Sequence, residues 1–146
     1  MLDPAPAREL SAGLLELVDF LTPNQTEAAL LLGASREPES YDDAEAACLK
    51  LLARGPSGVI LKMGELGVVI ADSKGCVPVR GFRVKAIDST AAGDTFNGAF
   101  AVALSEGKTI AEAARFANAA GAVSVTRPGA QSSIPNRAEV DQMLAS

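Results

Sequence analysis

The stretch DSTAAGDTFNGAF, residues 88–100, carries the strongest structural signal in the sequence. Its first half is polar and then small at residues 91–93, so another group can approach the backbone closely there. Its second half places Phe96 and Phe100 four residues apart, which is the spacing of one face of a helix. The stretch therefore predicts a tight turn followed by a helix, near 95–105, that packs against a sheet.

The start of that helix is a candidate anion site. The first amides of a helix have no acceptor within the helix, and the helix dipole makes this end positive. Phosphate is the commonest biological anion that such a site binds. Asp94 lies inside the first turn. Its carboxylate either complements the dipole, as in many helices, or accepts a hydroxyl proton beside a bound phosphoryl group. Residue chemistry alone leaves both interpretations open.

Outward from this stretch, predicted helices alternate with short apolar strands. Apolar runs bounded by turn residues predict strands at 18–21, 59–62, 68–71 and 76–79. Helical spacing and composition predict helices around Leu10 to Leu17, at 26–32, from Tyr41 with Asp42 or Asp43 as the cap, at 109–124 and at 137–144. This alternation favours a single α/β domain, residues 1–146, whose sheet is covered on both faces.

Composition excludes several classes of function. A net charge of −5 argues against a nucleic-acid partner, which needs a surplus of Lys and Arg. No apolar run reaches the roughly 18 residues of a membrane span. Cys48 and Cys76 lack CxxC spacing, so we expect free thiols in a cytoplasmic protein. The sequence contains no His, so acid–base chemistry falls first to carboxylates.

Residues 88–100 also resemble the second signature of the ribokinase family, the phosphofructokinase-B-type carbohydrate kinases, where an Asp, a Thr and small residues precede Gly-Asp-x-Phe. The same family resembles this chain, in the same order, at LDPAPAREL, TPNQTEA, GFRVKAIDS and VTRPGAQSSIP. The resemblance covers nearly the whole chain. It implies the C-terminal part of a ribokinase-like fold, a three-layer α/β/α sheet. It also implies ATP-dependent phosphorylation of a sugar hydroxyl, ribose to ribose 5-phosphate first of all, with Mg²⁺ and a monovalent cation such as K⁺.

The resemblance implies roles for particular residues. Asp94 would be the catalytic base, and the anion hole for the phosphoryl group would be Ala91, Ala92 and Gly93. Asn24 and Glu27 match the family's NxxE motif, which implies that Asn24 contacts phosphate and that Glu27 organises Mg²⁺ through water. Without the resemblance, Glu27 is a solvated helix residue. The positions that surround a monovalent cation in the family, mostly through backbone carbonyls, are Asp88, Thr90, Ser124, Arg127, Gly129 and Ser133.

Further nucleotide contacts are implied around residues 62–67, KMGELG, where the family usually shows a Thr-Leu-Gly-x-x-Gly turn. Lys62 replaces the Thr, so the hydroxyl hydrogen bond would be lost and the Lys would contact a phosphate instead. Gly64 and Gly67 would lie against ATP, although both are also typical of a hairpin turn. Asn118 stands where the family lines the adenine pocket; otherwise it is a polar residue on an Ala-rich surface.

Members of this family are much longer than this chain, and their sugar-binding residues, lid strands and first signature lie in an N-terminal half that is absent here. We therefore expect the isolated chain to be weakly active or inactive, because those residues position the sugar hydroxyl. Open strand edges favour a homodimer. Two alternatives stay open: a nucleoside or fructose-phosphate kinase of the same family, and a non-catalytic nucleotide-binding remnant. The run at 125–135 favours the ribokinase branch.

Overall fold

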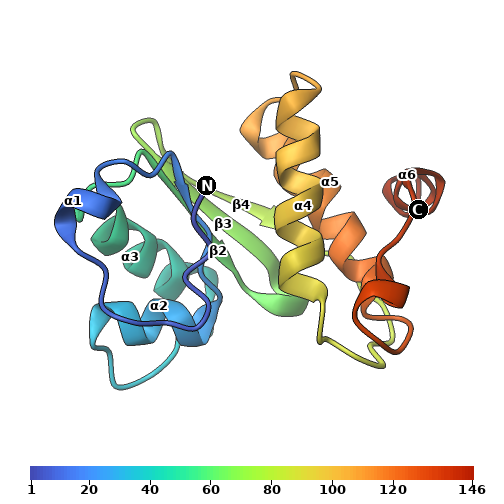
Figure 1. The fold of residues 1–146 in the computed structure, drawn as a ribbon, viewed down its shortest axis with the longest axis horizontal. Helices are drawn as coiled ribbons and strands as arrows, with labels where there is room; N and C mark the ends of the chain where they lie inside the picture. The colour runs from blue at the N-terminus through green and yellow to red at the C-terminus, as the bar shows by residue number, and fades with distance from the viewer. The chain divides into compact units, whose positions relative to one another are not determined.

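The computed structural model describes residues 1–146, and it has the mixed α/β composition that the sequence predicts (Figure 1). The elements, in chain order, are α1 (Ala12–Leu15), β1 (Phe20–Leu21), α2 (Gln25–Leu32), α3 (Tyr41–Leu52), β2 (Gly58–Lys62), η1 (Gly64–Leu66), β3 (Gly67–Asp72), β4 (Gly75–Arg80), α4 (Ala92–Ser105), α5 (Ile110–Ser124), η2 (Gln131–Ser133) and α6 (Arg137–Leu144). The α/β class is therefore confirmed.

The residues group into two compact units. The first comprises Met1–Gly64 and Val68–Pro78, and the second comprises Glu65–Gly67 and Val79–Ser146. The sequence predicts one domain over residues 1–146, and that boundary stays a prediction. Each unit has its own buried residues, so each is described by itself.

The first unit is organised by a sheet whose strand order is β1-β2-β3-β4. β1 pairs in parallel with β2, and β2 pairs antiparallel with β3, with Ile60 opposite Ile70. An isolated parallel bridge joins Leu2 to Leu21 and extends this pairing. The apolar runs that predicted β2 and β3 are buried along almost their whole length, as expected for strands covered on both faces. Helices α2 and α3 pack together and lie beside β2 (Figure 1).

The helix ends of the first unit follow local chemistry. α2 ends at Gly33, whose φ of 61° is the left-handed conformation that terminates many helices. The predicted cap of α3 was wrong: the N-cap is Ser40, whose side chain accepts from the amide of Asp43. Asp43 in turn accepts from the amide of Ser40, which makes a capping box. Asp43 is therefore the third helical residue rather than the cap, and it still contributes to the start of the helix.

The N-terminal helix is shorter than predicted. Only the single turn α1 forms, in which Leu15 is 1% exposed and Leu14 is 42% exposed. Leu17, beyond the end of this helix, is 82% exposed. Helical spacing of leucines predicts a buried face only where another element covers it. Without such cover on Leu14 and Leu17, the pattern produced one turn and no longer helix.

The two cysteines are free, as the sequence predicts. Cys48 on α3 is completely buried, and its thiol donates to the carbonyl of Val69 on β3, with 3.7 Å between sulfur and oxygen. Burial raises the pKa of the Cys48 thiol to about 12. Cys76 on β4 is partly exposed.

The second unit is built on the helix pair α4 and α5, with α6 against α5 (Figure 1). Phe96 and Phe100, the residues that predicted α4, stack with ring centroids 6.1 Å apart, and Phe100 has no exposed surface. Truncating a buried Phe typically costs about 3–5 kcal/mol, so this pair is a large part of the unit's stability. The helix extends to Ala92 at its start, which places Asp94 in its first turn as predicted.

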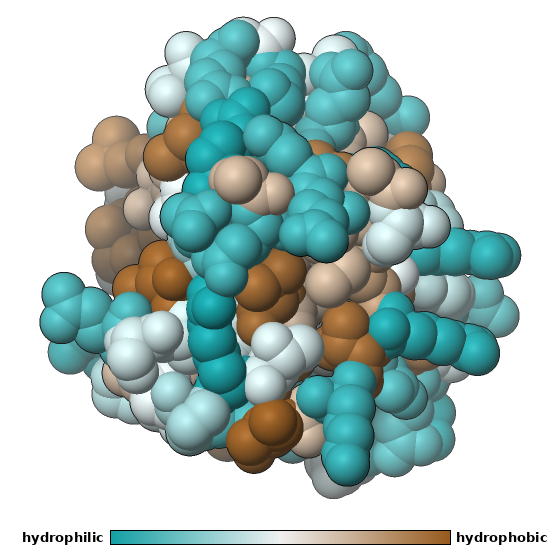
Figure 2. Space-filling model, turned by 90° about the vertical axis from the view of Figure 1, so that its right-hand side faces the viewer, coloured by the Kyte–Doolittle hydropathy of each residue, from teal (hydrophilic) through white to brown (hydrophobic).

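The surface on the side of α6 is predominantly hydrophilic, with smaller apolar areas between the polar side chains (Figure 2). None of the helices has both the length and the hydropathy that a membrane span requires.

Candidate functional site

The start of α4 leaves backbone amides available. The N-cap is Ala91, with φ −106° and ψ 9°, and no side chain bonds to this end of the helix. Ala92 donates to the carbonyl of Ser89, and Thr95 donates to that of Ala91. The amides of Gly93 and Asp94 lie between these two bonds and have no protein acceptor. Small side chains and two free amides fit an anion, because no protein group satisfies these donors.

Asp94 is the third residue of α4, and its side chain is exposed. No hydrogen bond or ion pair to another residue holds its carboxylate, so both oxygens are available to a ligand. Thr95, the next residue, is 6% exposed, and its hydroxyl has no hydrogen-bond partner. No sequence pattern points to Thr95, because a hydroxyl without a partner is recognised only once the surrounding packing is known.

Asp88 organises the turn that leads into α4. Its Oδ1 accepts from the amide of Thr90 at 2.9 Å and from the hydroxyl of Thr90 at 2.5 Å. Its Oδ2 accepts from the amide of Gly129 at 2.9 Å. The Thr90 hydroxyl, followed by the Gly129 amide, lowers the pKa of the Asp88 carboxyl to about 2. Three of the six predicted cation-site residues are therefore brought into direct contact.

The other three predicted cation-site residues lie in the same unit but use their side chains elsewhere. Arg127 donates from Nε to the carbonyl of Ser133 at 3.2 Å. The hydroxyl of Ser133 bonds to the carbonyl of Ala130, and that of Ser124 bonds back to Gly121 within α5. No three His, Cys, Asp or Glu side chains gather into a metal-binding cluster.

In the first unit, Asn24 and Glu27 form the capping box of α2. Asn24 Oδ1 accepts from the amide of Glu27 at 2.8 Å, and Glu27 Oε2 accepts from the amide of Asn24 at 2.8 Å. Lys62, at the end of β2, forms a parallel bridge with Asn24, so two of the predicted nucleotide contacts are neighbours. The ammonium of Lys62 lies 3.2 Å from Asp3 Oδ1, so the charge expected to meet a phosphate is already paired.

Gly64 and Gly67 require glycine for different structural reasons. Gly64 has a φ of 59° and no neighbouring atoms where a side chain would project, so only its backbone conformation favours glycine. Gly67 has a φ of 94°, and a Cβ there would overlap the carbonyl oxygen of Val79 and the amide of Gly81. The hairpin interpretation therefore explains Gly67 by itself, and a nucleotide contact there stays a prediction.

Asn118 is not a polar residue on an Ala-rich surface, because its side chain is only 8% exposed. Its Nδ2 donates to the carbonyls of Val79 and Arg80 at 3.0 and 3.2 Å, and so ties α5 to the end of β4. The predicted contact with adenine stays a prediction.

Known proteins resemble this chain along nearly its whole length. The pfkB family of carbohydrate kinases matches residues 1–137. A ribokinase from Haemophilus influenzae is 46% identical over 144 residues, which cover 99% of this chain and 46% of the relative. The crystal structure of ribokinase from Thermotoga maritima superposes with a TM-score of 0.87 at 45% identity, over 99% of this chain and 48% of that one. A ribokinase from Arabidopsis thaliana, complexed with ribose and ATP, gives a TM-score of 0.84 at 34% identity, over 94% of this chain and 44% of that one.

The chain belongs to the pfkB family of carbohydrate kinases, because the family match extends over most of its residues. It spans about half the length of the curated relatives it matches. The resemblance noted at residues 88–100 is thereby confirmed at the level of the family.

Proposed function

We propose that this chain carries the phosphoryl-transfer part of an ATP-dependent kinase that phosphorylates a sugar hydroxyl, with ribose as the leading candidate. The observation that carries the proposal is the start of α4, where two free amides and the unpaired carboxylate of Asp94 occur within consecutive residues. Membership of a carbohydrate kinase family and the ribokinase relatives support the same reaction. A nucleoside or fructose-phosphate kinase is the alternative within the family.

In the proposed mechanism, Asp94 accepts the proton of the attacking hydroxyl as the oxygen bonds to the terminal phosphorus of ATP. The bond between that phosphorus and the leaving ADP oxygen breaks, and the proton remains on the Asp94 carboxyl. Ala91, Ala92 and Gly93 would form the anion hole, where the free amide of Gly93, with that of Asp94, stabilises the charge that develops on the phosphoryl oxygens. Bound Mg²⁺ would offset the charge of the ATP phosphates. Asp94 therefore contributes general-base catalysis and the turn contributes electrostatic stabilisation.

The remaining roles in the proposal follow from the family resemblance. Asn24, Lys62, Gly64, Gly67 and Asn118 would contact the nucleotide, and Glu27 would organise Mg²⁺ through water. The turn between Asp88 and Ser133 would hold a monovalent cation such as K⁺. The contacts of Asp88 with Thr90 and Gly129 support this last role, because they fix the backbone whose carbonyls would bind the ion.

Replacing Asp94 with Asn in a complete enzyme, which also carries the residues that position the sugar hydroxyl, tests the base assignment. The substitution keeps the size of the side chain but removes the proton acceptor, so we expect kcat for ribose phosphorylation to fall by about 10²–10⁴-fold. Asp42→Asn is the matched control, because Asp42 is also an exposed first-turn carboxylate. The stability of both variants should stay within about 0.5 kcal/mol of the wild type. Near-normal turnover by Asp94→Asn would eliminate the general base.

A non-catalytic nucleotide-binding role is the second candidate, because small residues and free amides at the start of α4 can bind a phosphate without transferring it. Calorimetry with ADP and a phosphorylation assay on the same sample separate the two. Binding together with turnover supports the kinase, whereas binding without turnover supports the second role.

We also propose that the chain forms a homodimer, because β4 ends the sheet and Val77 on this strand is 53% exposed. Sedimentation at several concentrations would contradict this if it gave only the monomer mass.

A further inference from the structure

Helix α6 is connected to the loop that follows α5 by a bidentate ion pair. The guanidinium of Arg127 donates to both carboxylate oxygens of Glu139, at 2.7 and 3.1 Å. Arg127 also donates from Nε to the carbonyl of Ser133. This one residue therefore connects the two ends of the loop to each other and to α6. Both side chains of the pair are about one-third exposed, and the forked geometry gives directional strength that a single contact lacks.

The same loop reaches the proposed phosphoryl site. Its Gly129 amide donates to Asp88, and Asp88 holds Thr90, which directly precedes the N-cap Ala91 of α4. In addition, the amides of Ile87 and Asp88 both donate to the carbonyl of Val125, at the other end of the loop. The position of the turn before α4 therefore depends on the loop at 125–133.

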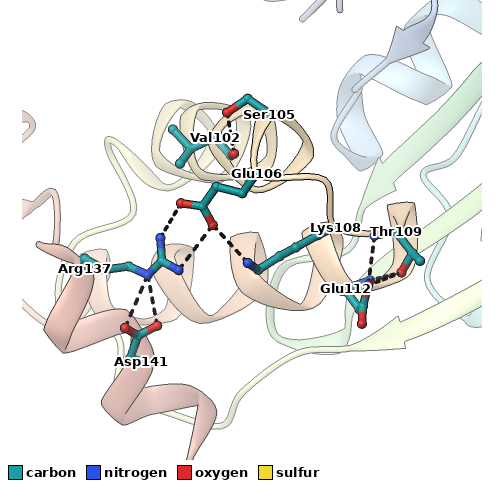
Figure 3. Close-up of polar contacts among 8 residues, drawn as sticks. All are labelled: Val102, Ser105, Glu106, Lys108, Thr109, Glu112, Arg137 and Asp141. Atoms are coloured by element: carbon teal, nitrogen blue, oxygen red, sulfur yellow. Dashed lines mark hydrogen bonds and ion pairs between the residues drawn. The ribbon is translucent and has the colours of Figure 1, made fainter.

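Helix α6 is also fastened at the far end of α4. Arg137 donates to both oxygens of Glu106, the C-cap of α4, at 2.6 and 3.2 Å, and to Asp141 on its own helix (Figure 3). Lys108 bonds to the same Glu106 at 2.9 Å. The guanidinium of Arg137 lies 4.8 Å from the centroid of the Phe116 ring on α5, which adds a cation–π contact. Helix α6 thus links the C-terminal end of α4 to the loop that holds its N-terminal end.

We propose that Glu139 is a positioning residue for the reaction. Its ion pair with Arg127 fixes the loop at 125–133. Gly129 of this loop then holds Asp88, and Asp88 holds the start of α4 in the conformation that receives the phosphoryl group. This inference rests on the proposed function. Glu139 touches none of the reacting groups, so it acts on the geometry of the free amides alone. Small displacements of such preorganised donors reduce turnover strongly.

Glu139→Gln is the informative substitution, because its side-chain oxygen can still accept from the Asn136 amide and cap α6, while the charge that pairs with Arg127 is lost. The matched control is Glu112→Gln. Glu112 has the same place in the capping box of α5, but its hydrogen bonds go only to Thr109, as Figure 3 shows. Both variants therefore weaken a helix start equally, and only one changes the loop.

Two measurements on the full chain test the proposal. Amide hydrogen exchange without nucleotide should rise in Glu139→Gln at the Gly129 and Thr90 amides and remain unchanged in the body of α5, because the loss is confined to the loop. In the phosphorylation assay, kcat should fall about tenfold while KM for the sugar changes less than twofold, since the proposal gives this loop no part in binding the sugar. Glu112→Gln should match the wild type in both measurements.

The outcomes are distinguishable. If the wild type turns over and Glu139→Gln behaves like Glu112→Gln, the positioning role is overturned and the proposed function stands. A rise in exchange spread over α5 and α6, with kcat unchanged, also overturns it, because Glu139 would then serve stability only. If the wild-type chain turns no sugar over, as the sequence leads us to expect, the amide exchange decides alone, and no rise at Gly129 and Thr90 in Glu139→Gln overturns the positioning role. A wild-type protein that binds no ADP overturns the proposed function, and the positioning role with it.

Discussion

Helix α4 begins differently from the other long helices. α2, α3, α5 and α6 each start with a complete capping box, formed by Asn24 and Glu27, Ser40 and Asp43, Thr109 and Glu112, and Asn136 and Glu139. Their N-cap residues are extended, whereas Ala91 has a ψ of 9° and offers no side-chain oxygen. A side-chain cap is worth about 1 kcal/mol, and among the α-helices only α4 lacks one. Where the donors are left free, a ligand can use them.

Two of the capped starts sharpen this comparison, because they share the sequence Pro-Asn-x-x-Glu. Glu139 at the start of α6 is paired with Arg127, which lowers its carboxyl pKa to about 2. Glu27 at the start of α2 has no cationic partner. The motif alone therefore makes a capped helix. Any ligand role for Asn24 and Glu27 depends on what else is near them, such as Lys62 beside Asn24.

The largest effect on binding should come from adding a second carboxylate to the first turn of α4, which already holds Asp94. Ala92→Asp places this carboxylate beside the free amides, and its charge opposes the terminal phosphate of ATP. We expect the affinity for ATP to fall at least tenfold, about 1.4 kcal/mol, while stability is unchanged or rises by about 0.5 kcal/mol. Ala92→Asn is the uncharged control of equal size. Calorimetry and thermal unfolding measure the two effects, and equal ATP affinity in both variants would contradict an anion site at this helix start.

A smaller effect separates the two Pro-Asn-x-x-Glu starts. Asn24→Ala and Asn136→Ala each remove the same cap, so both should lose about 1 kcal/mol of unfolding free energy. Only Asn24→Ala should also weaken ADP binding, because only Asn24 is a proposed nucleotide contact. Chemical denaturation and calorimetry on both variants test this. If both variants bind ADP with the same affinity, Asn24 acts only as the N-cap of α2.

The smallest effect is a dependence of stability on acid pH. Hydrogen bonds from Arg137 and then Lys108 lower the pKa of Glu106 from its usual 4.5 to about 2. A carboxylate with a lowered pKa stabilises the folded state above its unfolded pKa, and this stabilisation is lost as the pH falls from about 4.5 through about 2. The melting temperature of Glu106→Gln should therefore change less between pH 5 and pH 2 than that of the wild type. If the two proteins show the same dependence of melting temperature on pH, Glu106 does not contribute to the pH dependence of stability.

Much of the fold was predictable because local signals agreed. The phenylalanines of α4, Gly33 at the end of α2 and the apolar run of β2 each indicated an element that the structure contains. The start of α3 at Tyr41 was predicted, but its cap was not, because Ser and Asp are both good caps and only the reciprocal hydrogen bonds between Ser40 and Asp43 decide between them.

Long-range contacts of the site were not predictable. Asn118 bonds to carbonyls 38 and 39 residues away, and Lys62 pairs with Asp3 across 59 residues. Hydrophobic periodicity and motif spacing do not indicate which residues so far apart in the sequence come into contact. The place of Asp94 in a first helical turn was predictable, because turn chemistry and helical spacing are both local.

The buried thiol of Cys48 has a consequence of its own. With a pKa of about 12 and no exposed surface, it carries almost no thiolate at neutral pH and offers no path to a reagent. Any alkylation of this sulfur must therefore wait until α3 moves away from β3. The rate at which a thiol reagent labels Cys48 therefore reports the local opening of α3 from β3.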